Sequence, residues 1–251
     1  MPHWMDLLRV LVGKELLVRY KGSFLGYFWS VLHPLAFAAV FYVVFKQIVR
    51  LEVDHYALVL VTALFPWQWL QNSINASPSW FLENAPLIKK VRFPRWTLVL
   101  AGALTDLTHF LFAVPVILAF LLFEGFPPKI EWLLWLPVLT AAQLLVAFGI
   151  SLVIASFNLF LRDLERLTTL VMLIWFYATP VLYPVDRVPE AYRALISFNP
   201  AGALIICWRS LFLEARVPLD SLFAAYVGGL LLVGFGAYVY RSLQWRFAEV
   251  V

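Results

Sequence analysis

Six apolar stretches recur along this 251-residue chain, separated by shorter and more polar segments. About 20 apolar residues form a helix long enough to cross the hydrocarbon core of a bilayer. The chain is 63% hydrophobic, whereas soluble domains are roughly half apolar. The pattern therefore predicts an all-α membrane protein with a single transmembrane domain over residues 1–251 and spans at about 24–46, 56–76, 96–123, 132–158, 167–183 and 219–240.

Six crossings would place both termini on one side of the membrane, and the cations indicate which side. Twelve of the 19 Lys and Arg residues fall in the amino-terminal segment, in the loops after the second and fourth spans, and in the tail. Cytoplasmic segments carry an excess of these residues. We therefore expect a multi-pass protein of the cytoplasmic (inner) membrane with both termini in the cytoplasm.

The amino-terminal segment, about residues 4–22, is amphipathic. Trp4, Leu7, Leu8 and Leu11 are spaced so that they share one face of a helix. Such a helix either lies along the membrane surface with its apolar face in lipid, or it packs as an ordinary amphipathic helix on the rest of the protein.

The loop after the second span is expected to contain a short helix on the cytoplasmic side. Ser77 is a favourable N-cap residue, and Pro78 suits the first helical position. We expect this helix to continue to about Asn84.

The last outer loop, residues 183–218, is too long for a simple turn. Asn199-Pro200 opens an apolar run over residues 201–213, which is too short to span a bilayer. We expect a re-entrant or surface-lying helix here, preceded by another around residues 190–197; an amphipathic extracellular loop helix is the alternative. The run places four apolar residues on one face: Leu204, Cys207, Trp208 and Leu211.

No catalytic constellation stands out. The four histidines are scattered, no H-x-x-x-H motif is present, and Cys207 is the only cysteine. Gly13-Lys14 is not part of a phosphate-binding P-loop, because it is followed by Glu15 and lacks an upstream glycine at the required spacing. If ATP drives this protein, a different chain must hydrolyse it, so ATP and Mg²⁺ are expected in a partner and no cofactor or metal in this chain.

Asp106 and His109 form the clearest polar pair within a predicted span. A charged residue at the centre of a membrane helix costs about 3 kcal/mol on insertion scales, so such residues are candidates for function. The alternative is a local hydrogen-bonded contact between helices, assisted by Thr105 or Thr108.

Asn158, Arg162 and Asp163 end the fourth span. Arg162 can serve as a topology anchor at the cytoplasmic surface, and Asp163 can cap the helix that follows. The alternative is a specific contact with a partner or with the neighbouring helix.

Four segments in order make the chain resemble the permease subunits of ATP-binding-cassette exporters of cell-surface polysaccharides. Arg19–Pro34 (RYKGSFLGYFWSVLHP) is similar to that family's entry to the first span, and Asn84–Arg95 (NAPLIKKVRFPR) to its cytoplasmic loop. Asn158–Leu164 resembles its exit from the fourth span. The outer segment is similar at Thr179–Pro184 (TPVLYP), which includes Pro180 and Tyr183, and at Asn199-Pro200.

The resemblance implies roles for particular residues. The segment at Arg19, Tyr20, Lys21 and Gly22 would form a gate helix and a substrate entry at the cytoplasmic mouth. The helix at 78–84 would couple the permease to the ATPase through Pro78, Trp80, Glu83 and Asn84. The outer-loop helices would close the far end. Permeases of this family work as homodimers with two nucleotide-binding ATPase chains.

The implied substrate is a lipid-linked polysaccharide, most often the O-antigen of lipopolysaccharide. Arg19 and Lys21 are candidates for attracting its diphosphate, and membrane lipid, not nucleic acid, is the other expected contact. The alternative cargo is teichoic acid, capsule, a drug or another lipid. The alternative class of protein is a membrane-embedded transferase for lipid-linked sugars or a structural scaffold. Aromatic rings can stack on sliding sugars, so the candidates for lining the channel are Tyr27, Trp29, Tyr42, Trp175 and Tyr177, with Trp67 and Trp69 also considered.

Overall fold

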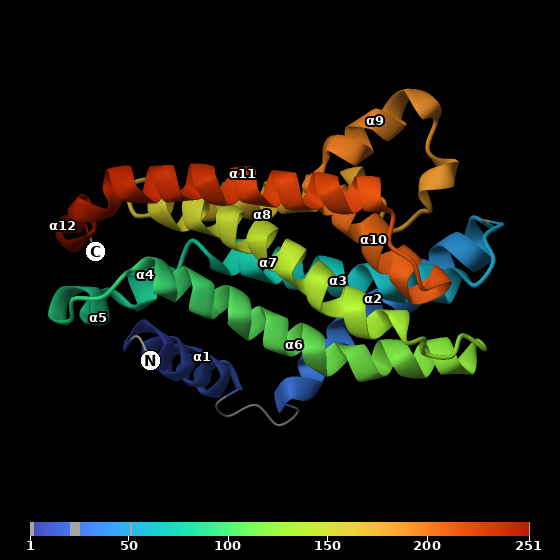
Figure 1. Cartoon of the computed structure of the whole chain (residues 1–251), viewed down its shortest axis with the longest axis horizontal. Coiled ribbons are helices and arrows are strands. Elements are labelled where there is room, and N and C mark those ends of the chain that lie inside the picture. Colours follow the sequence, from blue (N-terminus) through green and yellow to red (C-terminus); the bar gives the residue numbers. More distant parts are fainter. Residues whose placement is uncertain (1–2, 21–25, 51, 251) are drawn as a thin grey trace.

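The computed structural model describes residues 3–20, 26–50 and 52–250, and every regular element within these residues is helical. Three long helices form the frame: α6 (Trp96–Phe123), α7 (Glu131–Asn158) and α11 (Leu219–Leu243). They run lengthwise along the molecule (Figure 1). The prediction of an all-α fold is confirmed.

Helices α7 and α11 pack closely because glycines face the contact. A Cβ added at Gly149 of α7 would lie 2.7 Å from the backbone of Leu232 and Val233 in α11. A Cβ at Gly236 of α11 would lie 2.8 Å from the carbonyl oxygen of Gly149. Small residues that allow two backbones to approach are a common means of helix association in membranes.

Among the described residues, four helical segments are long and apolar enough to cross a membrane, and they match the predicted spans one, three, four and six. Both α6 and α7 contain 28 residues, a length of about 42 Å, which exceeds the hydrocarbon thickness of about 30 Å. The first span combines α2 (Trp29–Tyr42) with a π-helical turn. The four segments are Trp29–Ile48, Trp96–Phe123, Glu131–Asn158 and Leu219–Arg246.

The other two predicted spans are helices of a different character. Helix α3 (Tyr56–Ala76) occupies the second predicted range, but its neighbours bury it along most of its length. Helix α8 (Leu164–Ala178) has only 15 residues, about 22 Å. It ends at residue 178, not at 183 as predicted, because Thr179 is extended before Pro180.

The core forms where α3, α7 and α10 (Pro200–Glu214) meet. Gln143 of α7 donates from Nε2 to the carbonyl oxygen of Pro66 in α3 at 2.7 Å. The same amide accepts from Nε1 of Trp208 in α10 at 2.5 Å. All three residues are buried, so one amide side chain joins three helices through satisfied polar groups.

Helices occupy both predicted ranges of the last outer loop. Helix α9 (Glu190–Phe198) projects from one end of the bundle, whereas α10 lies within it (Figure 1). Residues on all sides of α10 are buried, so α10 does not lie on the surface of the fold. The predicted shared face, Leu204, Cys207, Trp208 and Leu211, is buried together with Ala203, Ile205 and Phe212.

The opposite end gathers α1 (His3–Tyr20) and three short helices, which are α4 (Trp80–Glu83), α5 (Ala85–Lys90) and α12 (Phe247–Val250). The N and C labels both lie at this end in Figure 1. Leu8 and Leu11 of α1 are buried against the bundle. Leu17 and Val18 remain exposed, so α1 packs on its own protein and still presents an apolar surface.

Three short 3₁₀ turns complete the described helices; they cover Gly26–Phe28, Val185–Arg187 and Gln244–Arg246.

Candidate coupling site and outer clamp

Two aromatic residues anchor the α4–α5 segment to the bundle. Trp80 is only 4% exposed and packs on α6 at Gly102, where an added Cβ would lie 2.3 Å from the indole ring. Phe81 is fully buried, and its ring centroid lies 5.0 Å from that of Phe247 in α12. Trp80, expected at the contact with an ATPase, therefore faces the interior of the fold.

The prediction that Ser77 caps the following helix is wrong. Its hydroxyl donates back to the carbonyl oxygen of Ile74 at 2.8 Å, in the last turn of α3. This backward bond is available because Ser77 itself has helical backbone angles. Pro78 is buried in the turn that follows, and α4 begins only at Trp80.

Asn84 joins α1 to the α4–α5 segment. Its Nδ2 donates to the carbonyl oxygen of Trp80 at 2.9 Å, which closes the end of α4. Its Oδ1 accepts from Nζ of Lys14 in α1 at 2.8 Å. Sequence reasoning considered Lys14 only as one of the amino-terminal cations and as part of a rejected P-loop. A partner 70 residues away leaves no local signal.

Asn158, at the end of α7, ties the same segment from the other side. Its Nδ2 donates to the carbonyl oxygen of Pro78 at 2.9 Å, and its side chain is buried. Three residues singled out in the sequence, Pro78, Asn84 and Asn158, thus belong to one connected unit. We call this unit, together with Lys14 and Trp80, the coupling unit.

Charged side chains lie on the exposed surface of the coupling unit. Glu83 at the end of α4 and Lys89 and Lys90 at the end of α5 are exposed. A partner protein that approaches this end would meet these side chains first. A displacement of α4 would then reach α1 through Lys14 and α7 through Asn158.

Other predicted site residues at this end lie apart from the coupling unit. Arg162 and Asp163 are exposed, and Asp163 occupies the N-cap position of α8 without a capping hydrogen bond from its side chain. Of the residues expected at the gate, Arg19 and Tyr20 are the last two residues of α1, and their side chains are outside those that the structure describes. Lys21 and Gly22 lie outside the described residues.

At the other end of the bundle, Asn199 connects α8 with α10. Its Oδ1 accepts from the backbone N–H of Ala201 at 3.1 Å, as an N-cap does, and also from Nε1 of Trp175 at 3.0 Å. Its Nδ2 donates to Oγ1 of Thr179 at 3.1 Å. Pro200 is the first residue of α10, in agreement with the expectation for Asn199-Pro200.

Arg209 of α10 holds the chain that follows α8. Its guanidinium donates to the carbonyl oxygens of Pro180 at 2.8 Å, Val181 at 3.1 Å and Tyr183 at 3.2 Å. Burial lowers the pKa of Arg209 to about 10, opposed by the charge of Asp186. The guanidinium therefore remains charged at neutral pH. We call these contacts the outer clamp. In the sequence, Arg209 is only one of the seven cations that lie outside the segments expected to be cytoplasmic.

Tyr183 belongs to the same region. Its hydroxyl donates to the carbonyl oxygen of Tyr177 at 3.0 Å, and burial raises its pKa. Tyr183 thereby folds the segment after α8 back on the end of that helix.

The aromatic candidates for lining a channel differ in how far their side chains are exposed. Trp29 is 51% exposed and Tyr177 is 57% exposed, while Tyr42 and Trp175 are half-buried. Trp67 and Trp69 are almost completely buried in the core and cannot line a channel from these positions. The side chain of Tyr27 lies outside those described.

The Asp106–His109 pair contacts a neighbouring helix. Asp106 accepts from Oγ of Ser73 in α3 at 3.0 Å, and Nδ1 of His109 lies 3.7 Å from its other oxygen. The hydroxyls of Thr105 and Thr108 donate to the carbonyl oxygens of Ala101 and Leu104 in their own helix. Within the described residues, no group of three or more His, Cys, Asp or Glu could hold a metal ion.

Comparison with known proteins places this arrangement in a family. A family model described as "ABC-2 type transporter" matches residues 6–213. Two proteins of Klebsiella pneumoniae, each named "O-antigen export system permease protein RfbA", are 40% and 39% identical over 246 residues, which cover 98% of this chain and 95% of theirs. A protein of the same name from Myxococcus xanthus is 29% identical over 252 residues with the same coverage. The chain therefore belongs to the ABC-2 type transporter family of membrane proteins.

Proposed function

We propose that this chain is the membrane subunit of an ATP-driven exporter that moves lipid-linked O-antigen polysaccharide across the cytoplasmic membrane. The observation that carries the proposal is the 40% identity, over 98% of the chain, to a protein named as an O-antigen export permease. The sequence contains no P-loop, so a separate nucleotide-binding subunit supplies ATP hydrolysis.

The coupling unit is the proposed contact with that subunit. Exposed Glu83 would meet the ATPase, while buried Trp80 and Asn84 transmit displacement to α6 and α1. This division of roles is supported by the contacts of Trp80 at Gly102 and of Asn84 with Lys14.

The membrane arrangement that we propose has six crossings with both termini cytoplasmic. The four long segments would cross together with α3 and α8, and α10 would enter the outer half without crossing. The basic residues at the end that holds α1, α4 and α5 favour a cytoplasmic location for that end.

A second copy of the chain would complete the channel. The rings of Phe41 in α2 and Phe176 in α8 lie 6.0 Å apart, so these helices are neighbours. Both helices expose many apolar residues, and a large exposed apolar face marks a contact with lipid or protein. We propose that two such faces meet around the path of the glycan, where Trp29 and Tyr177 would contact the sugar and Arg19 and Lys21 the diphosphate at its entrance.

Export in cells tests this function. The test uses a strain that lacks its own permease gene. This strain should regain surface O-antigen when it receives this chain together with the nucleotide-binding subunit that works with it. A catalytically inactive ATPase in the same strain should not restore it. Surface glycan restored by the inactive pair, or ATPase activity unaffected by the purified lipid-linked glycan, would contradict the proposal.

A further inference from the structure

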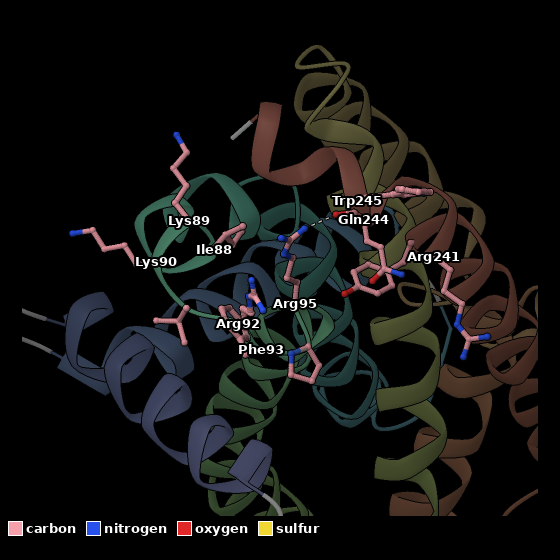
Figure 2. Close-up of a pocket in the computed structure, with 12 residues that line it drawn as sticks. Ile88, Lys89, Lys90, Arg92, Phe93, Arg95, Arg241, Gln244 and Trp245 are labelled. Atoms are coloured by element: carbon pink, nitrogen blue, oxygen red, sulfur yellow. Dashed lines mark hydrogen bonds between the residues drawn. The ribbon is translucent and has the colours of Figure 1, made fainter.

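A basic cavity of about 740 Å³ opens between the loop after α5 and the end of α11. None of its lining residues is acidic. Five of them are cations: Lys89, Lys90, Arg92, Arg95 and Arg241. Figure 2 shows Arg92 and Arg95 side by side in the middle of the view, whereas Lys89 and Lys90 extend away from it.

The cations of this cavity lack carboxylate partners among the described side chains. Arg95 donates to the carbonyl oxygen of Gln244 and lies 6.0 Å from the ring centroid of Phe247. Both contacts position its guanidinium without neutralising it. Arg92 and Arg241 are exposed and form no ion pair with a described residue. Clustered like charges favour an anionic ligand, for which guanidinium groups suit the geometry of a phosphate.

A second cavity of about 480 Å³ continues from the first. The two share Pro94, Tyr240, Arg241 and Gln244. The remaining lining of the second cavity is apolar and comes from α6, α7 and α11, all candidate membrane spans: Trp96, Leu100, Phe148, Leu152 and Ala237. A polar site thus opens directly into a hydrocarbon-lined groove between helices.

We propose that these joined cavities bind an anionic phospholipid of the surrounding membrane. Its phosphate would lie beside Arg92 and Arg95, and Arg241, which lines both cavities, would attract the anionic head group where they join. One acyl chain would follow the groove beside Leu100 and Ala237. Basic pockets between membrane helices bind anionic head groups in this way. The site is separate from the proposed glycan entrance at Arg19 and Lys21, and it does not depend on which cargo is exported.

An acidic surface of a partner protein is the competing occupant, and the groove argues against it. A protein surface would need only the exposed basic residues, whereas the adjoining groove matches an acyl chain. Lys89 and Lys90 line the cavity, but their side chains extend away from its middle, so they can also meet a partner.

Lipid retention by the purified complex of permease and ATPase tests the site. The complex would be placed in nanodiscs of phosphatidylcholine with a minor fraction of phosphatidylglycerol, and bound lipid would be measured by native mass spectrometry. Wild type should retain phosphatidylglycerol selectively. The double variant Arg92→Gln/Arg241→Gln should lose this selectivity on the order of tenfold. The matched control Arg9→Gln/Arg166→Gln, which removes two exposed cations that do not line the cavity, should behave as wild type.

Two further arms separate lipid from other occupants. Ala237→Phe should fill the groove and reduce phosphatidylglycerol retention with the five cations intact, while inorganic phosphate should not displace the lipid. Equal retention in the Arg92→Gln/Arg241→Gln variant would overturn the proposal. Displacement by inorganic phosphate would overturn it in favour of a free anion. If the Arg92→Gln/Arg241→Gln variant loses the ATPase from the complex while its lipid retention is unchanged, the proposal would be overturned in favour of a protein contact.

Discussion

Lys14 and Asn84 are 70 residues apart in the chain, and Nζ of Lys14 donates to Oδ1 of Asn84 at 2.8 Å. This bond joins the amino-terminal helix α1 to the segment that we propose contacts the ATPase. The Nδ2 of the same amide closes the end of α4 on Trp80. The bond offers a direct mechanical connection between α4 and α1.

Replacement of Lys14 by Gln should weaken the coupling of ATP hydrolysis to export. A double-mutant cycle with Asn84→Ala should show an interaction energy of about 0.5–1 kcal/mol, since the ammonium is partly exposed and screened by solvent. Thermal unfolding and export would be measured together. Arg9→Gln, an exposed change on the same helix, is the control. Additive effects of the two substitutions would show that the bond contributes nothing.

Gly102→Ala should destabilise the protein, because the added Cβ would lie 2.3 Å from the ring of Trp80. Overpacking of this kind costs about 1–3 kcal/mol, and a displaced Trp80 should also impair export. Gly13→Ala is the matched control, since no atom lies within 4 Å of the new Cβ; it should be neutral or slightly stabilising. The measurement is the midpoint of thermal unfolding in detergent. Equal midpoints for Gly102→Ala and wild type would refute the tight contact.

Arg209→Met should destabilise the outer end, because three carbonyl oxygens in the clamp lose a charged donor. Hydrogen bonds to a charged group contribute about 1.5–3 kcal/mol each, so a loss of several kcal/mol is expected. The folded pKa of about 10 lies above the neutral range. The contribution of Arg209 should therefore be constant between about pH 6 and pH 8.

Proteolysis of the outer loop provides the readout for the clamp. Cleavage within residues 179–199 should accelerate in Arg209→Met and change little in Arg216→Met, whose side chain is exposed. A loop equally protected in both variants would argue against the clamp.

Asp106→Asn should retain export, because an amide oxygen can still accept from Ser73. Asp106→Leu should lower the midpoint of unfolding, since it removes the acceptor between α3 and α6 and leaves the hydroxyl of Ser73 without this partner. Ser73→Ala tests the same bond from the other side. Loss of export in a stable Asp106→Asn variant would instead favour a role for the carboxylate in transport.

The sequence by itself determined the helical class, the position of most helices and the family. The ranges of α6, α7 and α11 could be predicted closely, because each is a long apolar run that the sequence shows directly. Asn199-Pro200 likewise marked the start of α10, because an N-cap and a first-turn proline act within the same turn.

Only the tertiary structure decided which way the side chains face and what they bond. Trp80 was expected to meet a partner but packs on Gly102, and α10 lies within the bundle because α3, α7 and α11 surround it. The partners of Lys14 and Arg209 are an amide 70 residues away and backbone carbonyl groups. Every residue carries a carbonyl, so residue type cannot identify such an acceptor; packing between distant segments brings these groups within bonding distance.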